Sequence, residues 1–326
     1  MIGLKIEGDA TFSVMTWNIY LGADLTPMIA ATPMQIPQRV TELFRQFLAT
    51  NFPSRAKTIA NQISLNKPDI IGLQEVAIWE LIPPNSNKVV YDFLDILLYE
   101  LKSKGVEYEV ATQNKNAEAT LPSSEGNYIC LKDRDVILIR KNSDLKITRK
   151  WESNFKTNLQ VNVIGQTVSI RRGWSAVDIS LKGYDFRVVN THLEPFSHEV
   201  QVSQANELLL GPGKTNLPLF FIGDFNSKAD RSSTKTYENL IASGFKDIWT
   251  ISGKGDGFTC CQNPDLLNAD SYLNERIDFI LLKNNINLDI IEAKLIGDSK
   301  ESRTKTKLWP SDHAGIIGRF KLNILK

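Results

Sequence analysis

Short apolar runs recur along nearly the whole chain, and this pattern limits the fold more than any other feature of the sequence. Each run has the length of a strand, is rich in β-branched or aromatic residues, and is followed by a polar cluster. The runs lie at residues 12–15, 70–73, 136–139, 176–179, 187–190, 219–222 and 279–282. The sequence therefore predicts many short strands spread over most of its length.

Segments with helical periodicity separate some of these strands. Apolar residues at helical spacing predict helices at residues 37–48, 54–65 and 90–104, and the second of them ends before Pro68. Strands interrupted by helices favour two sheets with helices outside, an α+β fold in the form of a four-layered α/β/β/α sandwich if the strands pair face to face. We expect long loops at residues 111–134 and 253–275, and such loops are often functional.

Composition favours one large globular domain and argues against a DNA-coating protein and a disulfide-framework protein. The 326 residues are 42% hydrophobic, and no linker or repeat divides them, so we predict one domain at residues 12–322 after an N-terminal extension at 1–11. The net charge of +1 means that a polyanion must be bound by a local patch, which argues against a DNA-coating protein.

The chain has three cysteines, Cys130, Cys260 and Cys261. They cannot form a disulfide framework and are interpreted as ordinary buried or loop thiols.

The N-terminus carries no recognisable secretory signal. Residues 1–5 lack a basic segment followed by an apolar run. We therefore expect a cytoplasmic protein, and secretion stays open because a chain whose signal had been removed would look the same. Nothing in the sequence indicates an obligate protein partner, and a monomer is the expectation.

Polar clusters stand at the ends of the predicted strands. A single carboxylate after a strand is usually a turn former or a helix cap. Five clusters in one chain favour a site collected on loops of a rigid scaffold. Four clusters follow strands and the last precedes one: Thr16-Trp17-Asn18, Gln74-Glu75, Asn190-Thr191-His192, Gly223-Asp224-Phe225-Asn226 and Ser311-Asp312-His313.

These residue types suit the hydrolysis of phosphate esters. The anionic oxygens of the ester repel a nucleophile, so the reaction needs a hard cation and an activated water. Mg²⁺ takes oxygen ligands and needs only one or two carboxylates besides the substrate phosphate. Glu75 and the amide of Asn18 fit that role, and Asp312 is a further candidate. Zinc is disfavoured, because the chain has three histidines and no helical metal-binding pair.

Together with Arg276-Ile277-Asp278-Phe279, the five clusters resemble the endonuclease/exonuclease/phosphatase superfamily in their order and approximate spacing. This superfamily is DNase I-like and includes AP endonucleases, deadenylases, neutral sphingomyelinases and inositol polyphosphate 5-phosphatases. The resemblance covers about residues 12 to 322. It implies the DNase I-like fold and metal-dependent phosphoesterase chemistry, and it does not specify a substrate.

The resemblance also implies roles for single residues around the metal and the water. Glu75 corresponds to the main ligand of Mg²⁺, for which Mn²⁺ is a substitute. Asp224 and His313 would polarise the attacking water, and Asn226 would hold that water or a phosphate oxygen. Asp278 would orient His313, because a carboxylate behind an imidazole fixes its tautomer and supports its charged form.

A second group would face the phosphate itself. By the same resemblance His192 acts as an acid or hydrogen-bond donor to the phosphate, with Asp133 as its carboxylate partner and Asp135 as a competitor for that place. Arg172 falls where relatives have a phosphate-binding arginine, and its planar donor fork suits two anionic oxygens. Arg171 is the alternative match.

The resulting hypothesis is a Mg²⁺-dependent, nuclease-like phosphodiesterase that uses in-line attack by water, with nucleic acid slightly ahead of a phospholipid head group as substrate. One alternative is a sphingomyelinase-like lipid phosphodiesterase or an inositol phosphatase-like phosphomonoesterase. Another is a catalytically inactive binding module. Tyr20 stands where AP endonucleases carry an acid, and Asn274-Glu275-Arg276 replaces the 5-phosphatase signature, so both of those branches are weakened.

Aromatic residues are further candidates for substrate contact. Trp79, Phe196, Trp249 and Trp309 have side chains that stack on bases or meet a lipid surface in other proteins. Aromatic residues are also common in cores, and an ordinary place in the core or at its rim is the preferred expectation for these four.

Overall fold

Two large sheets make up most of the protein. The computed structural model describes residues 10–163, 166–284 and 288–323, and within these ranges it contains an eight-stranded, a six-stranded and a two-stranded sheet. The first consists of β1 (Ala10–Asn18), β2 (Ile70–Gln74), β3 (Ile78–Ile82), β4 (Val89–Asp92), β5 (Tyr108–Pro122), β6 (Tyr128–Arg140), β15 (Leu288–Ile296) and β16 (Gly315–Leu322). The second consists of β7 (Lys146–Asn154), β10 (Gly173–Leu181), β11 (Tyr184–His192), β12 (Leu219–Asp224), β13 (Lys246–Asp247) and β14 (Asp278–Lys283). The third is a hairpin of β8 (Leu159–Val163) and β9 (Gln166–Ile170).

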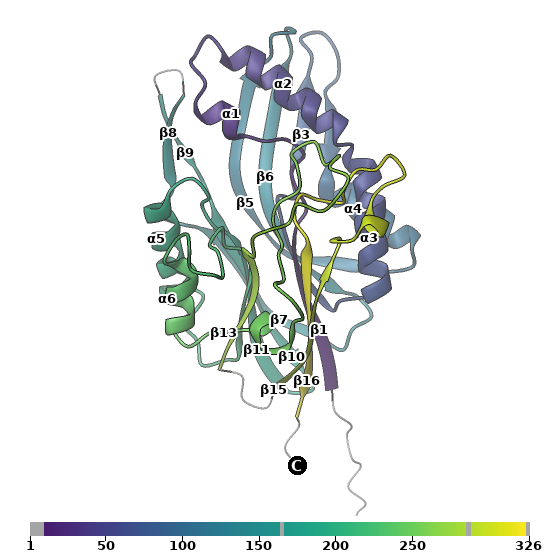
Figure 1. Ribbon diagram of the computed structural model, residues 1–326, viewed down its shortest axis with the longest axis vertical. Coiled ribbons are helices and arrows are strands. Elements are labelled where there is room, and N and C mark those ends of the chain that lie inside the picture. The colour runs from purple at the N-terminus through teal and green to yellow at the C-terminus, as the bar shows by residue number, and fades with distance from the viewer. Residues whose placement is uncertain (1–9, 164–165, 285–287, 324–326) are drawn as a thin grey trace, which may run out of the picture.

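Helices cover the outer faces of the two large sheets. In Figure 1, α3 and α4 lie on one side of the sheets, and α5 and α6 lie on the other. The helices are α1 (Thr26–Ile29), α2 (Ile36–Ala49), α3 (Phe52–Asn66), α4 (Phe93–Ser103), α5 (His198–Leu210), α6 (Thr236–Ala242), α7 (Ile248–Ser252) and the 3₁₀ turn η1 (Lys300–Ser302). Among the described residues, no helix has the length and apolar composition needed to cross a membrane.

Three hydrophobic clusters hold the layers together. One packs the first sheet against α2, α3 and α4, the second lies between the two sheets, and the third packs the second sheet against α5 and α6. Alternation along β1 explains how one strand serves two clusters: Phe12 and Val14 face the second sheet, whereas Met15 and Trp17 face the helices. The predicted four-layered sandwich is confirmed.

Most predicted elements are present, and three boundaries differ. All seven apolar runs lie in strands, and α2 and α3 match the first two predicted helices. The prediction of a helix over residues 90–104 is wrong at its start, because β4 runs to Asp92. The side chain of Asp92 accepts from Leu94 N at 2.9 Å and caps α4, which begins at the next residue. The expected loop at 111–134 is wrong, since β5 and β6 form a long hairpin there. β1 begins at Ala10, inside the expected extension, whose residues 1–9 lie outside the described residues.

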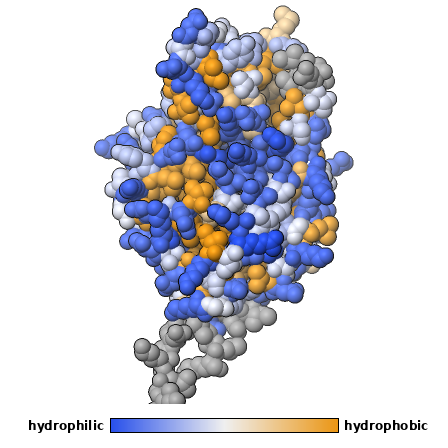
Figure 2. Space-filling view, turned by 180° about the vertical axis from the view of Figure 1, so that it is seen from behind, coloured by the Kyte–Doolittle hydropathy of each residue, from blue (hydrophilic) through white to orange (hydrophobic). Residues whose placement is uncertain are grey.

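The predicted aromatic residues divide between core and surface. Trp79, Trp249 and Trp309 are buried, and Phe196 is 49% exposed. The preferred expectation of ordinary core or rim residues is therefore confirmed for the three tryptophans, which lie in the core, and Phe196 lies at the surface. Figure 2 shows the face turned away from Figure 1, where hydrophilic residues cover much of the surface and hydrophobic residues form separate patches.

Candidate active site

Strand register brings the polar clusters to one edge of the sandwich. Asn18 pairs with Gln74 at the ends of the parallel strands β1 and β2. In the other sheet, Asp224 at the end of β12 lies beside His192 of β11 and opposite Asp278 of β14. Because the two sheets pack face to face, these ends meet, and residues far apart in the sequence become neighbours.

The amide of Asn18 joins carboxylates from both sheets. Its Nδ2 donates to Glu75 Oε1 at 3.0 Å and to Asp224 Oδ2 at 3.1 Å. Its Oδ1 accepts from Tyr20 N at 3.0 Å. The N–H groups of Asn18 thus hold the two carboxylates in place, and its oxygen accepts one backbone hydrogen bond. The expected role of Asn18 as an oxygen ligand of a metal stays a prediction, because an amide oxygen has two lone pairs.

At its Nδ1, His192 is held by an arginine and not directly by a carboxylate. Arg172 Nη1 lies 3.0 Å from His192 Nδ1 and 3.4 Å from Asp133 Oδ2. The expected direct pair of Asp133 with His192 is replaced by this chain of three residues. Asp135 is not the partner in its place, because it accepts from Asn116 Nδ2, which also donates to Asp133.

The contact with Arg172 fixes the tautomer of His192. A guanidinium can only donate, so Nδ1 accepts and the ring proton of the neutral imidazole is on Nε2. Burial, together with the charges of Arg172 and His313, lowers the pKa of His192 well below its usual value. The neutral ring therefore presents Nε2–H, which lies 3.4 Å from Asp224 Oδ2.

His313 has the opposite electrostatic surroundings. Its Nδ1 lies 2.8 Å from Asp278 Oδ2, and its Nε2 lies 3.8 Å from Asp224 Oδ2. Burial alone would lower the pKa of His313, but the carboxylates of Asp278, Asp312 and Asp224 outweigh it and raise the pKa well above its usual value. The two histidines thus flank one carboxylate in different charge states.

Asp224 is fixed through both of its oxygens. Besides the contact with Asn18, its Oδ1 accepts from the backbone N–H of Asn226 at 2.9 Å. The Asn226 side chain donates to Leu193 O at 2.9 Å, so in the structure this residue shapes the turn after β12. Burial, followed by the charge of Asp278, raises the pKa of Asp224 to about 7.

The chain turns sharply where it delivers these groups. Tyr20, Glu75 and Asn226 have positive φ values of 58°, 56° and 49°, a region that costs non-glycine residues on the order of 1 kcal/mol each. Gly223 has a φ of 142°, and a Cβ there would lie 1.9 Å from Thr191 O. Glycine is therefore required beside Asp224 for β12 to lie against β11.

Glu75 and Asp312 form an oxygen-rich set that suits a hard divalent cation. Glu75 Oε2 accepts from Leu21 N at 2.8 Å. Burial is the main cause that raises the pKa of both carboxyls, that of Asp312 to about 7, and the charge of Glu75 raises the pKa of Asp312 further. A cation bound by partly buried carboxylates reverses such shifts, and oxygen ligands are those that Mg²⁺ prefers. The residues present therefore fit the expected ion.

A second arrangement of metal-binding residue types is less suited to an ion. One ligand atom each from Asp224, Asp278 and His313 lies within 4.8 Å of the others. However, His313 Nδ1 and Asp278 are already hydrogen-bonded to each other. This group is better described as an oriented histidine beside a carboxylate.

We expect Glu75→Gln to raise the Mg²⁺ concentration needed for half-maximal activity by about tenfold or more, since even indirect metal contacts are worth that much. The substitution removes one negative charge and keeps the shape of the side chain. Activity as a function of Mg²⁺ concentration measures the shift. Glu107→Gln, at an exposed ion pair with Lys141, is the matched control, and an unchanged Mg²⁺ dependence of Glu75→Gln would remove Glu75 from the metal site.

Sequence reasoning missed Arg55, which supports the site from behind. This residue is fully buried in α3. Its guanidinium donates to the backbone oxygens of Ile19 at 2.8 Å, Tyr20 at 2.9 Å and Pro310 at 3.0 Å. It thereby joins the turn after Asn18 to the segment that precedes His313. An arginine within a helical pattern gives no sequence signal for such a role, because it is typical of a solvated helix face.

Two residues of the polar clusters have a structural role. Gln74 Nε2 donates to Asn190 Oδ1 at 2.7 Å across the space between the sheets, and Asn190 Nδ2 donates to Leu73 O at 3.1 Å. All three residues are buried. These amides fix the spacing of the two sheets next to the site and do not enter the group of catalytic candidates.

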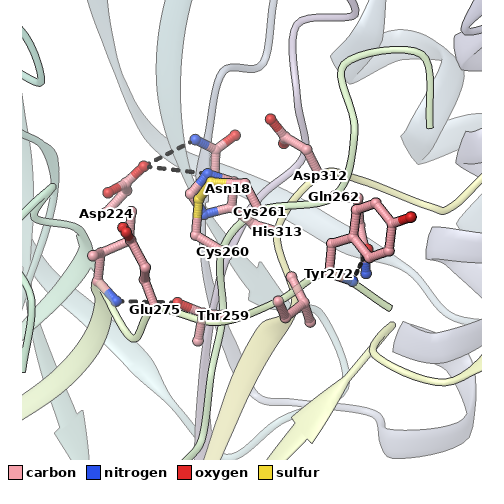
Figure 3. Close-up of a disulfide and its surroundings, with 12 residues drawn as sticks. Asn18, Asp224, Thr259, Cys260, Cys261, Gln262, Tyr272, Glu275, Asp312 and His313 are labelled. Atoms are coloured by element: carbon pink, nitrogen blue, oxygen red, sulfur yellow. Dashed lines mark hydrogen bonds and ion pairs between the residues drawn. A yellow bond between two sulfur atoms is a disulfide. The ribbon is translucent and has the colours of Figure 1, made fainter. Parts of the chain in front are cut away.

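The irregular segment over residues 253–275 lies against the final cluster. Gln262 N donates to Asp312 O and Ala314 N donates to Thr259 O, both at 2.8 Å, so the segment backs His313 (Figure 3). The structure also joins Cys260 to Cys261 by a disulfide. The interpretation of Cys260 and Cys261 as free thiols is therefore wrong. Rules based on cysteine spacing consider disulfides that close a loop, and these two residues are neighbours in the sequence. Cys130 is buried and free, as expected.

Comparisons with known proteins agree with this architecture. The sequence model of the endonuclease/exonuclease/phosphatase family matches residues 15–313. Among curated proteins, none matches the chain. Similar solved structures include an endonuclease/exonuclease/phosphatase family protein from Bacteroides thetaiotaomicron, which is 16% identical with a TM-score of 0.58 over 97% of this chain and 100% of that one.

Two further structures share the fold over almost all of this chain. D. rerio TDP2 complexed with a single-strand DNA product is 17% identical, with a TM-score of 0.57 over 96% of this chain and 99% of that one. An endonuclease/exonuclease/phosphatase from Beutenbergia cavernae is 18% identical, with a TM-score of 0.60 over 96% of this chain and 72% of that one. At these identities the likeness establishes the fold alone.

Proposed function

Since this chain belongs to the endonuclease/exonuclease/phosphatase family, whose members hydrolyse phosphate esters, we propose that it is a divalent-metal-dependent phosphodiesterase in which water attacks phosphorus directly. The observation that carries the proposal is the position of Asp224, whose Oδ2 lies 3.4 Å from His192 Nε2 and 3.8 Å from His313 Nε2. A neutral and a charged imidazole around one carboxylate form a set that can accept, hold and donate a proton.

Glu75 and Asp312 are the residues that would hold the metal ion. Mg²⁺ bound there supplies Lewis-acid polarisation of the phosphoryl oxygens. Mn²⁺ accepts the same oxygen ligands and is the expected substitute. Asn18 keeps Glu75 and Asp224 at a fixed separation through its two N–H groups.

Asp224 is the proposed acceptor of the proton from the attacking water. Its orientation is fixed by Asn18 at Oδ2 and by the Asn226 backbone at Oδ1. His313, oriented by Asp278 at Nδ1, presents a positive charge that favours the ionised form of Asp224. Positioned proton transfer of this kind contributes about 10²- to 10⁴-fold to a rate.

His192 and Arg172 are the proposed contacts of the phosphate. His192 presents Nε2–H, a donor that can hydrogen-bond a nonbridging oxygen or the leaving oxygen. Arg172 holds the ring from behind and adds a positive charge that attracts an anionic substrate. Both contributions strengthen as negative charge develops in the transition state.

The inactive binding-module hypothesis finds no support in the geometry. An inactive member of the family is expected to have lost at least one group of the hydrolytic set. Glu75, His192, Asp224 and His313 are all present in this chain. Nucleic acids and phospholipids both contain the phosphodiester that this set can hydrolyse, and the reaction requires no protein partner.

A substrate panel tests the proposal. The purified protein is incubated with Mg²⁺ or EDTA and supercoiled DNA, RNA, bis-p-nitrophenyl phosphate, sphingomyelin liposomes or a soluble inositol phosphate. Mg²⁺-dependent cleavage of a diester is expected. A folded protein that cleaves none of these substrates contradicts the proposal and supports the binding-module alternative, whereas cleavage of the inositol monoester alone supports a phosphomonoesterase.

A further inference from the structure

A cavity opens directly beside the candidate phosphate-binding residues. Its volume is about 400 Å³, within the range that binds small-molecule ligands. Arg172, which contacts His192, lines it. Leu21, whose backbone N–H donates to Glu75, lines it as well. The cavity and the catalytic residues therefore share walls at two places and form one continuous site.

The rest of the cavity is apolar. Among the described residues that line it, the polar or charged ones are Glu118, Thr120, Asp133 and Arg172. The others are aliphatic or aromatic, and most of them come from α1, α2, β5, β6 and the β8–β9 hairpin, in the upper left of Figure 1. A nucleobase placed there would leave most of its N–H and C=O groups without partners, which costs free energy. A hydrocarbon chain has no such groups.

The β8–β9 hairpin is built as an apolar wall of this cavity. Its strands pair with each other and join neither large sheet, and an isolated two-stranded hairpin has little stability of its own. Gln160 Nε2 donates to Ser169 Oγ at 3.0 Å on its polar face. Four residues of the other face, paired across the strands, line the cavity: Leu159 with Ile170 and Val161 with Val168.

Apolar residues at the cavity are also open to solvent. Ile29 of α1 is 46% exposed, Val168 of β9 is 37% exposed, and Phe196, which follows β11, is 49% exposed. All three line the cavity. Apolar surface gathered around one concave site indicates a ligand that covers it.

We propose that this cavity binds the hydrocarbon chain of a lipid phosphoester while Arg172 and His192 bind its phosphate. The inference rests on the proposed phosphodiesterase function and names its substrate class. It moves the preference from nucleic acid, which the sequence slightly favoured, to a lipid. The phosphate of such a ligand would contact Arg172 and His192. Its hydrocarbon chain would cover the apolar faces of α1 and of the β8–β9 hairpin.

Binding of alkyl phosphates tests the cavity independently of catalysis. Titration calorimetry of the full chain with methyl, butyl and octyl phosphate, each below its micelle concentration, gives the dissociation constants. Each methylene buried is worth about a fourfold gain in affinity, so octyl phosphate is expected to bind at least about tenfold more tightly than methyl phosphate. Equal affinities, or tighter binding of thymidine 5′-phosphate than of octyl phosphate, overturn the inference.

Two substitutions on adjacent residues of β9 provide a matched pair. Val168→Asp puts a charge on the face that lines the cavity and is expected to reduce the ratio of octyl to methyl affinity to about one. Thr167→Asp puts the same charge on the opposite face and is expected to keep the wild-type ratio. If both ratios fall equally, the cavity is not the chain-binding site, and if Val168→Asp fails to fold, the wild-type series still decides.

Hydrolysis separates this inference from the proposed function. With Mg²⁺, the rate constant kcat/KM for p-nitrophenyl alkyl phosphates is expected to increase with the length of the alkyl group. Hydrolysis that does not depend on chain length contradicts the lipid inference and leaves the phosphodiesterase proposal intact. Tight binding of octyl phosphate without hydrolysis of any ester supports the chain-binding cavity and contradicts the phosphodiesterase proposal.

Discussion

Asp224→Asn is expected to lower kcat by about 10³-fold, the middle of the range for a positioned proton acceptor, while KM changes little. The amide cannot accept the proton of the attacking water, yet it has the shape of the carboxylate. Its single oxygen can still accept one of the two N–H groups, from Asn18 or from Asn226, that the carboxylate accepts. Steady-state kinetics on the best diester of the panel, at saturating Mg²⁺, measures the effect.

The control for Asp224→Asn is a similar change away from the site. Asp230→Asn alters an aspartate that accepts from Ser232 N, and it is expected to retain wild-type kcat. Thermal unfolding of both variants checks that the fold is unchanged. If Asp224→Asn keeps more than about a tenth of the wild-type kcat, the loss is smaller than the contribution of a general base. Asp224 is then not the proton acceptor.

Arg55→Met is expected to lower the free energy of unfolding by about 3 kcal/mol, because backbone oxygens lose a charged donor inside the protein. Arg55 Nε donates to Thr50 O at 2.9 Å, and the guanidinium also binds the oxygens of Ile19, Tyr20 and Pro310. Met fills a similar volume and supplies no donor. Urea unfolding followed by circular dichroism measures the loss.

A control on the neighbouring helix isolates the effect of burial. Arg45 of α2 is largely exposed and pairs with Glu125, so Arg45→Met is expected to change stability by less than about 1 kcal/mol. If Arg55→Met is no more destabilising than Arg45→Met, the hydrogen bonds of Arg55 do not hold the turns of the site together.

The sandwich could be predicted because its central strands are apolar on both faces. Residues 219–222 of β12 illustrate this, since Phe220 and Ile222 pack between the sheets and Phe221 packs toward α5 and α6. The part of the β5–β6 hairpin that precedes the apolar run at residues 136–139 could not be predicted in the same way. Its buried positions carry Asn114, Asn116, Asp133 and Asp135, which bond to one another, so the apolar signal of a strand is missing.

The candidate site could be predicted as a set of residues and not as a set of contacts. Short motifs identify His192, Asp224 and His313, because each follows or precedes a strong strand signal. Which atoms meet depends on rotamers and on packing between the sheets. That is why the position of Arg172 between Asp133 and His192, and the N–H groups that Asn18 directs at two carboxylates, appear only in the structure.

The apolar cavity also has no signature in the sequence. Its walls come from segments as distant as α1 and β9, and each apolar residue there would equally suit a core. Only the structure shows that the apolar face of the β8–β9 hairpin lines an open space beside Arg172. The proposed lipid substrate rests on the position of that face and not on any motif.

The measurement that tests the central claim most directly is the hydrolysis rate of bis-p-nitrophenyl phosphate with EDTA and after Mg²⁺ is restored, for the wild-type protein and Asp224→Asn in parallel. The metal-dependent mechanism predicts that EDTA abolishes the wild-type rate, that excess Mg²⁺ restores it, and that Asp224→Asn stays nearly inactive in both conditions. A wild-type rate that EDTA leaves unchanged, or a restored rate that Asp224→Asn shares, would contradict it.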